Sequence, residues 1–136
     1  MEQEDYLLRE IGKIGLLLRA IIGILTNNKE NLSLTIGNHF DKTKEILLNE
    51  TGFDLAEFLT LDETSSNKYL LQFKGINPEN IELLAEVLAQ FGRNEQSDNK
   101  KSFLKKAIQL YALCEKTDKT FSFDRERKMN ELKNAI

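Results

Sequence analysis

Several residue types are scarce in this chain of 136 residues, and each scarcity excludes a class of structure. One valine, Val87, and one proline, Pro78, stand against 22 leucines and 11 isoleucines. β-Sheets favour β-branched and aromatic residues, and their turns are rich in glycine and proline. A leucine-rich chain with long stretches free of glycine and proline is therefore predicted to be all-α. The same composition excludes a β-sandwich, a β-barrel and a doubly wound nucleotide-binding fold.

The residues of catalytic and metal chemistry are scarce too, because the chain has one cysteine, Cys114, and one histidine, His39. A single cysteine excludes an internal disulfide and a multi-cysteine zinc site. A Cys/His nucleophile pair needs an orienting third group, and His39 has no glutamate three residues before it, as a di-metal bundle would require. We expect no catalytic residue, no metal site and no cofactor. The sequence therefore predicts a protein that is not an enzyme.

No targeting or membrane-spanning segment is expected. The first dozen residues are acidic, where a secretory signal would be basic. The most apolar stretch runs from Ile14 to Leu25, which is too short to span a bilayer, and Arg19 interrupts it. The sequence thus predicts a cytoplasmic protein without contact with a membrane.

The net charge of −3 is unevenly distributed along the chain. Residues 51–98 carry nine acids and three bases, whereas residues 99–136 carry ten bases and five acids. Clustered bases can contact nucleic-acid phosphates, and the candidate basic surface consists of Lys101, Lys105, Arg125 and Lys128. Because acids interleave with these bases, a solvated helix face is the favoured interpretation. Nucleic-acid binding is the alternative.

A helix is predicted from about Gln3 to Leu25, with apolar residues at coiled-coil spacing. These residues are Leu7, Ile11, Ile14, Leu18, Ile21 and Leu25. They form either the inner face of an ordinary core helix or the self-association seam of a homodimer. Gly12, Gly15 and Gly23 also lie inside this helix, and each costs about 1 kcal/mol of helix propensity relative to alanine. Close approach of another backbone would offset that cost.

The remainder of the chain is predicted to add short helices to a single domain, 1–136. Residues 1–50 are expected to form an antiparallel helical hairpin, and residues 51–136 a helical C-terminal half. Asn77 and Pro78 predict a helix start, and Ser122 predicts another. Four glycines are expected at or near helix ends. They are Gly37, Gly52, Gly75 and Gly92.

Residues 81–114 resemble a single degenerate tetratricopeptide repeat. The matching positions are Ile81, Leu84, Ala85 and Leu88 in its first helix and Ala107, Tyr111 and Cys114 in its second. The connection between the two helices is about ten residues longer than the tight turn of such a repeat. The resemblance implies a tetratricopeptide-like C-terminal half that offers a surface to a protein partner.

Four segments are also similar to a bacterial protein family of unknown function. They are Gln3-Glu4-Asp5-Tyr6-Leu7-Leu8-Arg9, Gly52-Phe-Asp-Leu55, Ala107 to Leu110, and Phe121-Ser-Phe-Asp124. This resemblance implies an all-helical bacterial protein with a repeat-like C-terminal half, and it implies no activity. The sequence predicts a helical protein that forms a homodimer and mediates protein–protein interaction. The alternative remains nucleic-acid binding through residues 99–136.

Overall fold

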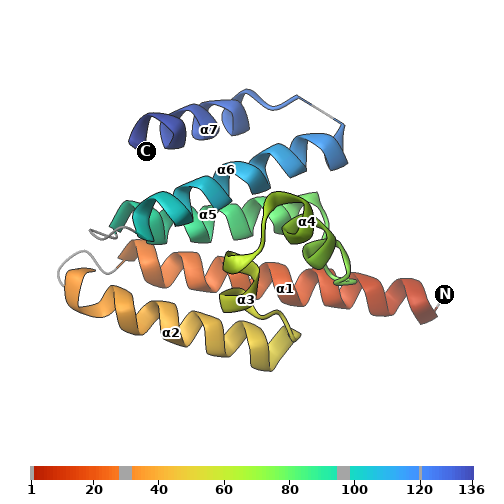
Figure 1. The fold of residues 1–136 in the computed structure, drawn as a ribbon. Coiled ribbons are helices and arrows are strands. Elements are labelled where there is room, and N and C mark those ends of the chain that lie inside the picture. The colour runs from red at the N-terminus through yellow and green to blue at the C-terminus, as the bar shows by residue number, and fades with distance from the viewer. Residues whose placement is uncertain (1, 28–31, 95–98, 120) are drawn as a thin grey trace.

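The computed structural model describes residues 2–27, 32–94, 99–119 and 121–136, and within these ranges the chain forms seven helices and no strand (Figure 1). The predicted all-α fold is therefore confirmed. The helices are α1 (Glu2–Asn27), α2 (Leu32–Thr51), α3 (Leu55–Thr60), α4 (Glu63–Leu71), α5 (Pro78–Asn94), α6 (Asn99–Asp118) and α7 (Phe123–Ala135). Over the described ranges, none of these helices is both long and apolar enough to cross a membrane.

Helix α5 lies at the centre of the molecule, where it contacts α1, α2 and α6 (Figure 1). Its inner face is buried almost completely, as Leu84, Ala85 and Leu88 show. The α5–α6 contact is the most extensive in the fold, and α7 packs on α6 through Met129 and Leu132. Helix α1 contacts α5 more extensively than it contacts α2, its neighbour in sequence. The first helix therefore buries its apolar face mainly against the C-terminal half.

Two predicted helix starts are confirmed by their capping hydrogen bonds. Helix α5 begins at Pro78, and the side-chain oxygen of Asn77 accepts a 2.9 Å hydrogen bond from the backbone N–H of Asn80. Helix α7 begins after Ser122, whose hydroxyl accepts a 3.2 Å hydrogen bond from the backbone N–H of Arg125. Each cap satisfies a backbone donor that has no partner within the first turn of its helix.

The four glycines expected at helix ends have different structural roles. Gly52 follows α2 with a φ of +77°, the left-handed conformation that ends helices. Gly75 lies in the loop before α5, where a Cβ atom would come within 2.9 Å of the Glu10 carbonyl oxygen of α1. The prediction for Gly37 is wrong, because α2 continues through it, whereas Gly92 lies in the last turn of α5, two residues before the helix ends at Asn94. At Gly92 the missing side chain makes room for Leu104 of α6.

Candidate interaction surface

The seam predicted on α1 is divided by the structure between the core and the surface. Ile14, Leu18, Ile21 and Leu25 are buried within the chain, with exposed fractions of 2–6%. Within one chain, α5 and its neighbours already cover these four residues. Ile11 is half-buried, and Leu7 remains 40% exposed. The pattern identified the face of α1 that is buried, but α5 rather than a second copy covers it.

The opposite face of α1 carries exposed apolar residues that the seam did not include. Leu8 is 65% exposed and Leu16 is 70% exposed. Gly12 lies midway between them, and a Cβ atom built on it would meet nothing within 4 Å. Leucine side chains so open to solvent, two turns apart on one helix face, form an apolar patch that nothing within the described chain covers.

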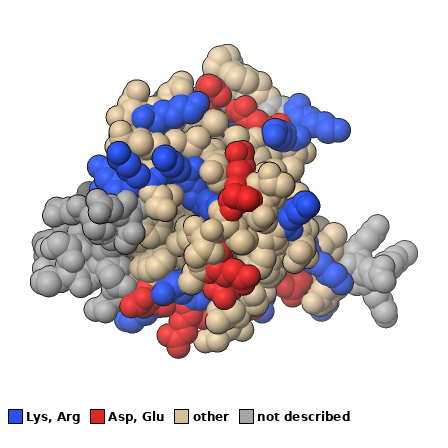
Figure 2. Space-filling model, in the orientation of Figure 1, with Lys and Arg blue, Asp and Glu red and all other residues tan. Residues whose placement is uncertain are grey.

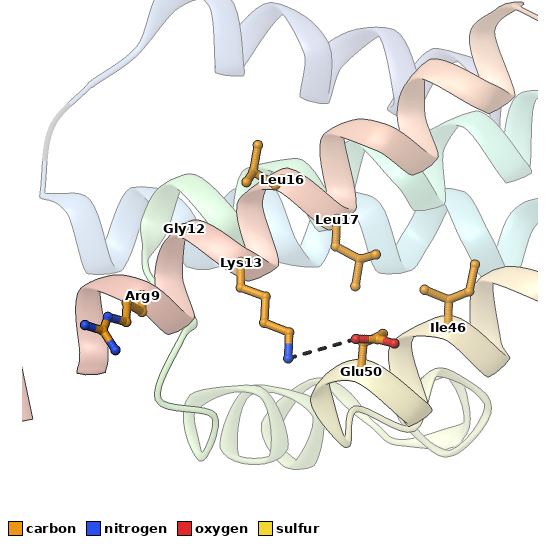
Figure 3. A pocket seen from close by; sticks show the side chains of 7 residues that line it. All are labelled: Arg9, Gly12, Lys13, Leu16, Leu17, Ile46 and Glu50. Carbon is orange, nitrogen blue, oxygen red and sulfur yellow. Dashed lines mark ion pairs between the residues drawn. The ribbon is translucent and has the colours of Figure 1, made fainter. Parts of the chain in front are cut away.

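This patch borders a groove between α1 and α2 (Figure 3). The groove has a volume of about 730 Å³ and is open to solvent. Its lining residues are Arg9, Gly12, Lys13, Leu16 and Leu17 of α1 and Ile46 and Glu50 of α2. In Figure 3, Leu17 and Ile46 point toward each other from the two helices, and Lys13 reaches toward Glu50. The Lys13 Nζ and Glu50 Oε2 atoms are 4.0 Å apart, at the edge of an ion pair.

A second, smaller depression continues the groove toward the C-terminal end of α1. Its volume is about 140 Å³, and Ile46 lines both hollows. Ile24 contributes an apolar side chain that is 53% exposed, and Lys42 lies at the rim. The incomplete contact between α1 and α2 thus leaves an apolar strip along one side of the molecule, flanked by charged side chains.

The four residues of the predicted basic surface do not come together on one surface. Arg125 does not contribute to a basic surface, because its side chain is 6% exposed and pairs with Asp118 at 3.3 Å and Glu82 at 3.7 Å. Lys128 pairs with Asp124 at 3.3 Å. Lys101 and Lys105 are exposed on α6 and form no ion pair within the described residues. Two lysines one turn apart make few phosphate contacts.

The distribution of charge over the surface also shows bases and acids mixed rather than separated. On the face in Figure 2, Lys and Arg lie mainly in the upper half, where Figure 1 places α6 and α7, with Asp and Glu between them. Arg127 illustrates the mixing, because it pairs with Asp124 and also with Glu131 at 3.3 Å. Arg127 and Lys128 therefore neutralise acids of their own helix, and Arg125 pairs with acids of α5 and α6, so these bases do not form a continuous basic surface.

The chain's one thiol is held in a protonated, inaccessible state. Cys114 is fully buried on α6, and burial raises the pKa of its thiol to about 12. Its Sγ atom lies 3.4 Å from the carbonyl oxygen of Pro78. A nucleophilic cysteine needs the thiolate form near neutral pH, so this environment opposes such a role. The side chain of His39 lies outside the described part of the structure.

One polar site in the interior was not predicted from the sequence. Lys106 is 5% exposed, and its ammonium donates hydrogen bonds to the Leu61 carbonyl oxygen at 2.7 Å and to the Ser66 hydroxyl. Burial lowers the pKa of Lys106, and the nearby carboxylates of Asp62 and Glu63 oppose that shift. The ammonium also lies 5.0 Å from the centre of the Phe58 ring.

This site has a structural function, because Ser66 is 1% exposed and a substrate has no access to either polar side chain. Leu61 caps the C-terminus of α3, where a cation is favourable to the helix dipole. The hydrogen bonds of Lys106 thereby connect α6 to the turn between α3 and α4. A lysine directly after another lysine, Lys105, gives no sequence signal of burial, because the partners of Lys106 lie 40 or more residues earlier in the chain.

Across the part of the chain that the structure describes, no three His, Cys, Asp or Glu side chains lie close enough to hold a metal ion. Comparisons of the sequence and fold with protein families, curated proteins and solved structures find no match. The outer face of α1 and the α1–α2 groove are therefore the surface features on which a function can be argued.

Proposed function

We propose that this protein is a non-enzymatic helical interaction protein that self-associates through the outer face of α1. The exposure of Leu8 and Leu16, at 65% and 70%, on either side of Gly12 carries the proposal. Burying one leucine side chain completely contributes about 2 kcal/mol, so covering four leucines in a dimer supplies a substantial part of an association energy. The groove beside Leu16 adds apolar surface from Leu17 and Ile46.

The remainder of the architecture is assigned within the same proposal. Helices α1 and α2, which run side by side in Figure 1, are taken as an antiparallel hairpin that presents the groove. The α5–α6 pair is taken as a tetratricopeptide-like unit, supported by its extensive contact and by the resemblance of residues 81–114. Its function here is to support α1, because the inner face of α5 packs against the buried residues of that helix.

Sedimentation velocity over a range of protein concentrations tests the proposal. The wild type is expected to shift toward a dimer as the concentration rises, and Leu16→Asp is expected to remain a monomer. Phe123→Asp is the matched control, because Phe123 is 84% exposed on α7 and the change introduces the same charge. The control should associate like the wild type, and circular dichroism should show that both variants are folded. A wild type that stays monomeric at all concentrations contradicts the proposal.

A further inference from the structure

The α1–α2 groove has an apolar centre and carries positive charge at both ends. Arg9 and Lys13 of α1 lie at one end (Figure 3). The smaller depression continues the apolar strip, and Lys42 of α2 lies on its rim. Among the described residues that line the two hollows, Glu50 is the one acid. Three cations and one carboxylate therefore border a strip of leucine and isoleucine side chains.

These cations are only partly neutralised within the chain. The Lys13 Nζ and Glu50 Oε2 atoms are 4.0 Å apart, and both side chains are about half exposed. Arg9 and Lys42 are exposed and form no ion pair with any side chain that the structure describes. The groove thus keeps a positive potential at each end, which attracts acidic groups from outside the chain.

From this pattern, and building on the proposed role in protein–protein interaction, we infer that the groove binds an amphipathic helix of a partner protein whose apolar stripe has acidic residues at both ends. The stripe packs on Leu16, Leu17 and Ile46. Helices bound in grooves use apolar anchors three and four residues apart on one face. Acids at the two ends of the stripe fix its position along the groove, and the same cations disfavour a basic helix.

The dimensions of the groove favour a helix over a small molecule. From Arg9 to Leu25, the α1 wall extends over about 24 Å along the helix axis. A bound helix of about 16 residues has the same length. The groove is open to solvent, so a small ligand would stay largely exposed, whereas sites for small molecules bury most of their ligand. Two helical walls with a third helix between them form a bundle-like arrangement.

Fluorescence anisotropy with two synthetic helical peptides of about 16 residues tests the inference. Both peptides carry the same stripe of leucines, and they differ only at the ends of the stripe, where one has glutamates and the other has lysines. The acidic peptide is expected to bind about tenfold more tightly, because several small attractions at exposed charges replace repulsions. Equal affinity for the two peptides, or no binding of the acidic peptide at millimolar concentration, overturns the inference.

Substitutions on α2 show whether the acidic peptide lies in the groove. Ile46 lines both hollows, and Ile46→Asn is expected to weaken binding about tenfold. Leu48→Asn is the matched control, because Leu48 is 49% exposed on the same helix and lines neither hollow. The control should bind like the wild type, and circular dichroism should show that both variants are folded. Equal loss in the two variants, or a loss in neither, places the peptide elsewhere and overturns the inference.

Charge reversal tests the acidic character of the partner. Arg9→Glu combined with Lys42→Glu is expected to reverse the preference in favour of the basic peptide. Lys105→Glu changes an exposed cation of α6 that has no ion pair within the described residues, so it should leave the preference unchanged. A preference for the acidic peptide that survives the double reversal contradicts recognition by charge.

The failure of this inference can be distinguished from failure of the proposed self-association. Leu8 lies in the exposed patch but does not line the groove. Leu8→Asn should therefore weaken the dimer in sedimentation and leave the affinity for the acidic peptide unchanged. A monomeric wild type that binds the acidic peptide in the groove refutes self-association alone. A wild type that forms dimers and binds neither peptide refutes the groove inference alone.

Discussion

Replacing glycines one at a time by alanine tests how the chain packs around α1. Gly12 and Gly75 form the sharpest contrast. A Cβ atom at Gly12 would meet nothing within 4 Å. A Cβ atom at Gly75 would lie 2.4 Å from Ile14 Cδ1 and 2.9 Å from the Glu10 carbonyl oxygen. The same chemical change is therefore expected to shift the free energy of unfolding in opposite directions.

The size of each effect follows from the surroundings. Gly12 lies inside α1, so alanine stabilises the helix by about 1 kcal/mol, which raises the melting temperature by about 4 °C in a domain of this size. At Gly75 the methyl group meets backbone that cannot retreat without moving α1. Overpacking of this kind costs about 2 kcal/mol, which lowers the melting temperature by about 8 °C.

Gly92 provides an intermediate case, because two effects compete there. Alanine improves the helix propensity of α5 by about 1 kcal/mol. Its Cβ, however, would lie 2.6 Å from Leu104 Cδ2, and Leu104 is completely buried. Since a fully packed leucine has little room to move, we expect a net loss of about 1 kcal/mol.

The assay is urea and thermal unfolding followed by far-ultraviolet circular dichroism, at a dilution where sedimentation shows only monomer. The expected order of stability is Gly12→Ala, wild type, Gly92→Ala and Gly75→Ala, from highest to lowest. A monomeric Gly12→Ala protein that is less stable than the wild type would show that the outer face of α1 is covered within the chain. An unchanged Gly75→Ala protein would show that the α4–α5 loop does not pack on α1.

Three further predictions concern caps, the thiol and the buried ion pair. Asp62→Ala should lower the melting temperature at neutral pH, because the Asp62 carboxylate accepts a hydrogen bond from a backbone N–H of α4, which holds the pKa of Asp62 below 3.8. The difference from the wild type should fade as the pH falls through that pKa, since protonation removes the charge. Asp62→Asn keeps a hydrogen-bond acceptor, so its melting temperature should fall less. Cys114, with a pKa near 12, should resist a thiol reagent in the native protein and react fully in denaturant, and reaction in the native state would contradict its burial. Arg125→Met should cost about 2 kcal/mol in urea unfolding, because it leaves Glu82 and Asp118 without their cation; an equally stable variant would show that the pair contributes nothing.

The helical class and several helix starts could be predicted because they depend on local chemistry. The caps at Asn77 and Ser122 bind backbone donors within three residues, so sequence alone locates them. The hydrophobic effect, in contrast, has no direction. The spacing of Ile14, Leu18 and Leu25 identifies a buried face of α1, but it does not say whether α5 or a second copy buries it. That information lies in the pairing of α1 with residues more than 50 positions later.

The local sequence also could not predict which charged side chains are buried. Arg125 and Lys128 have the same sequence signal, a base on a short polar helix. The fold buries Arg125 beside Glu82 of α5 and leaves Lys128 near the surface with Asp124. Lys106 is buried because a carbonyl and a hydroxyl near the α3–α4 turn accept hydrogen bonds from its ammonium. A charge enters the interior only where such partners exist, and these partners are distant in sequence.

A substitution at Gly12 is expected to change the stability of the monomer and the affinity of the proposed dimer in opposite directions. Measuring both quantities therefore gives the strictest test of that dimer. Gly12→Gln introduces a good helix former whose long side chain has open space around it in the monomer. The monomer should therefore become more stable. The same side chain would stand between the exposed Leu8 and Leu16 on the outer face of α1, so the proposed dimer should weaken. A variant that is harder to unfold but poorer at associating is what a glycine retained for a second copy predicts, whereas a glycine without a function would leave association unchanged.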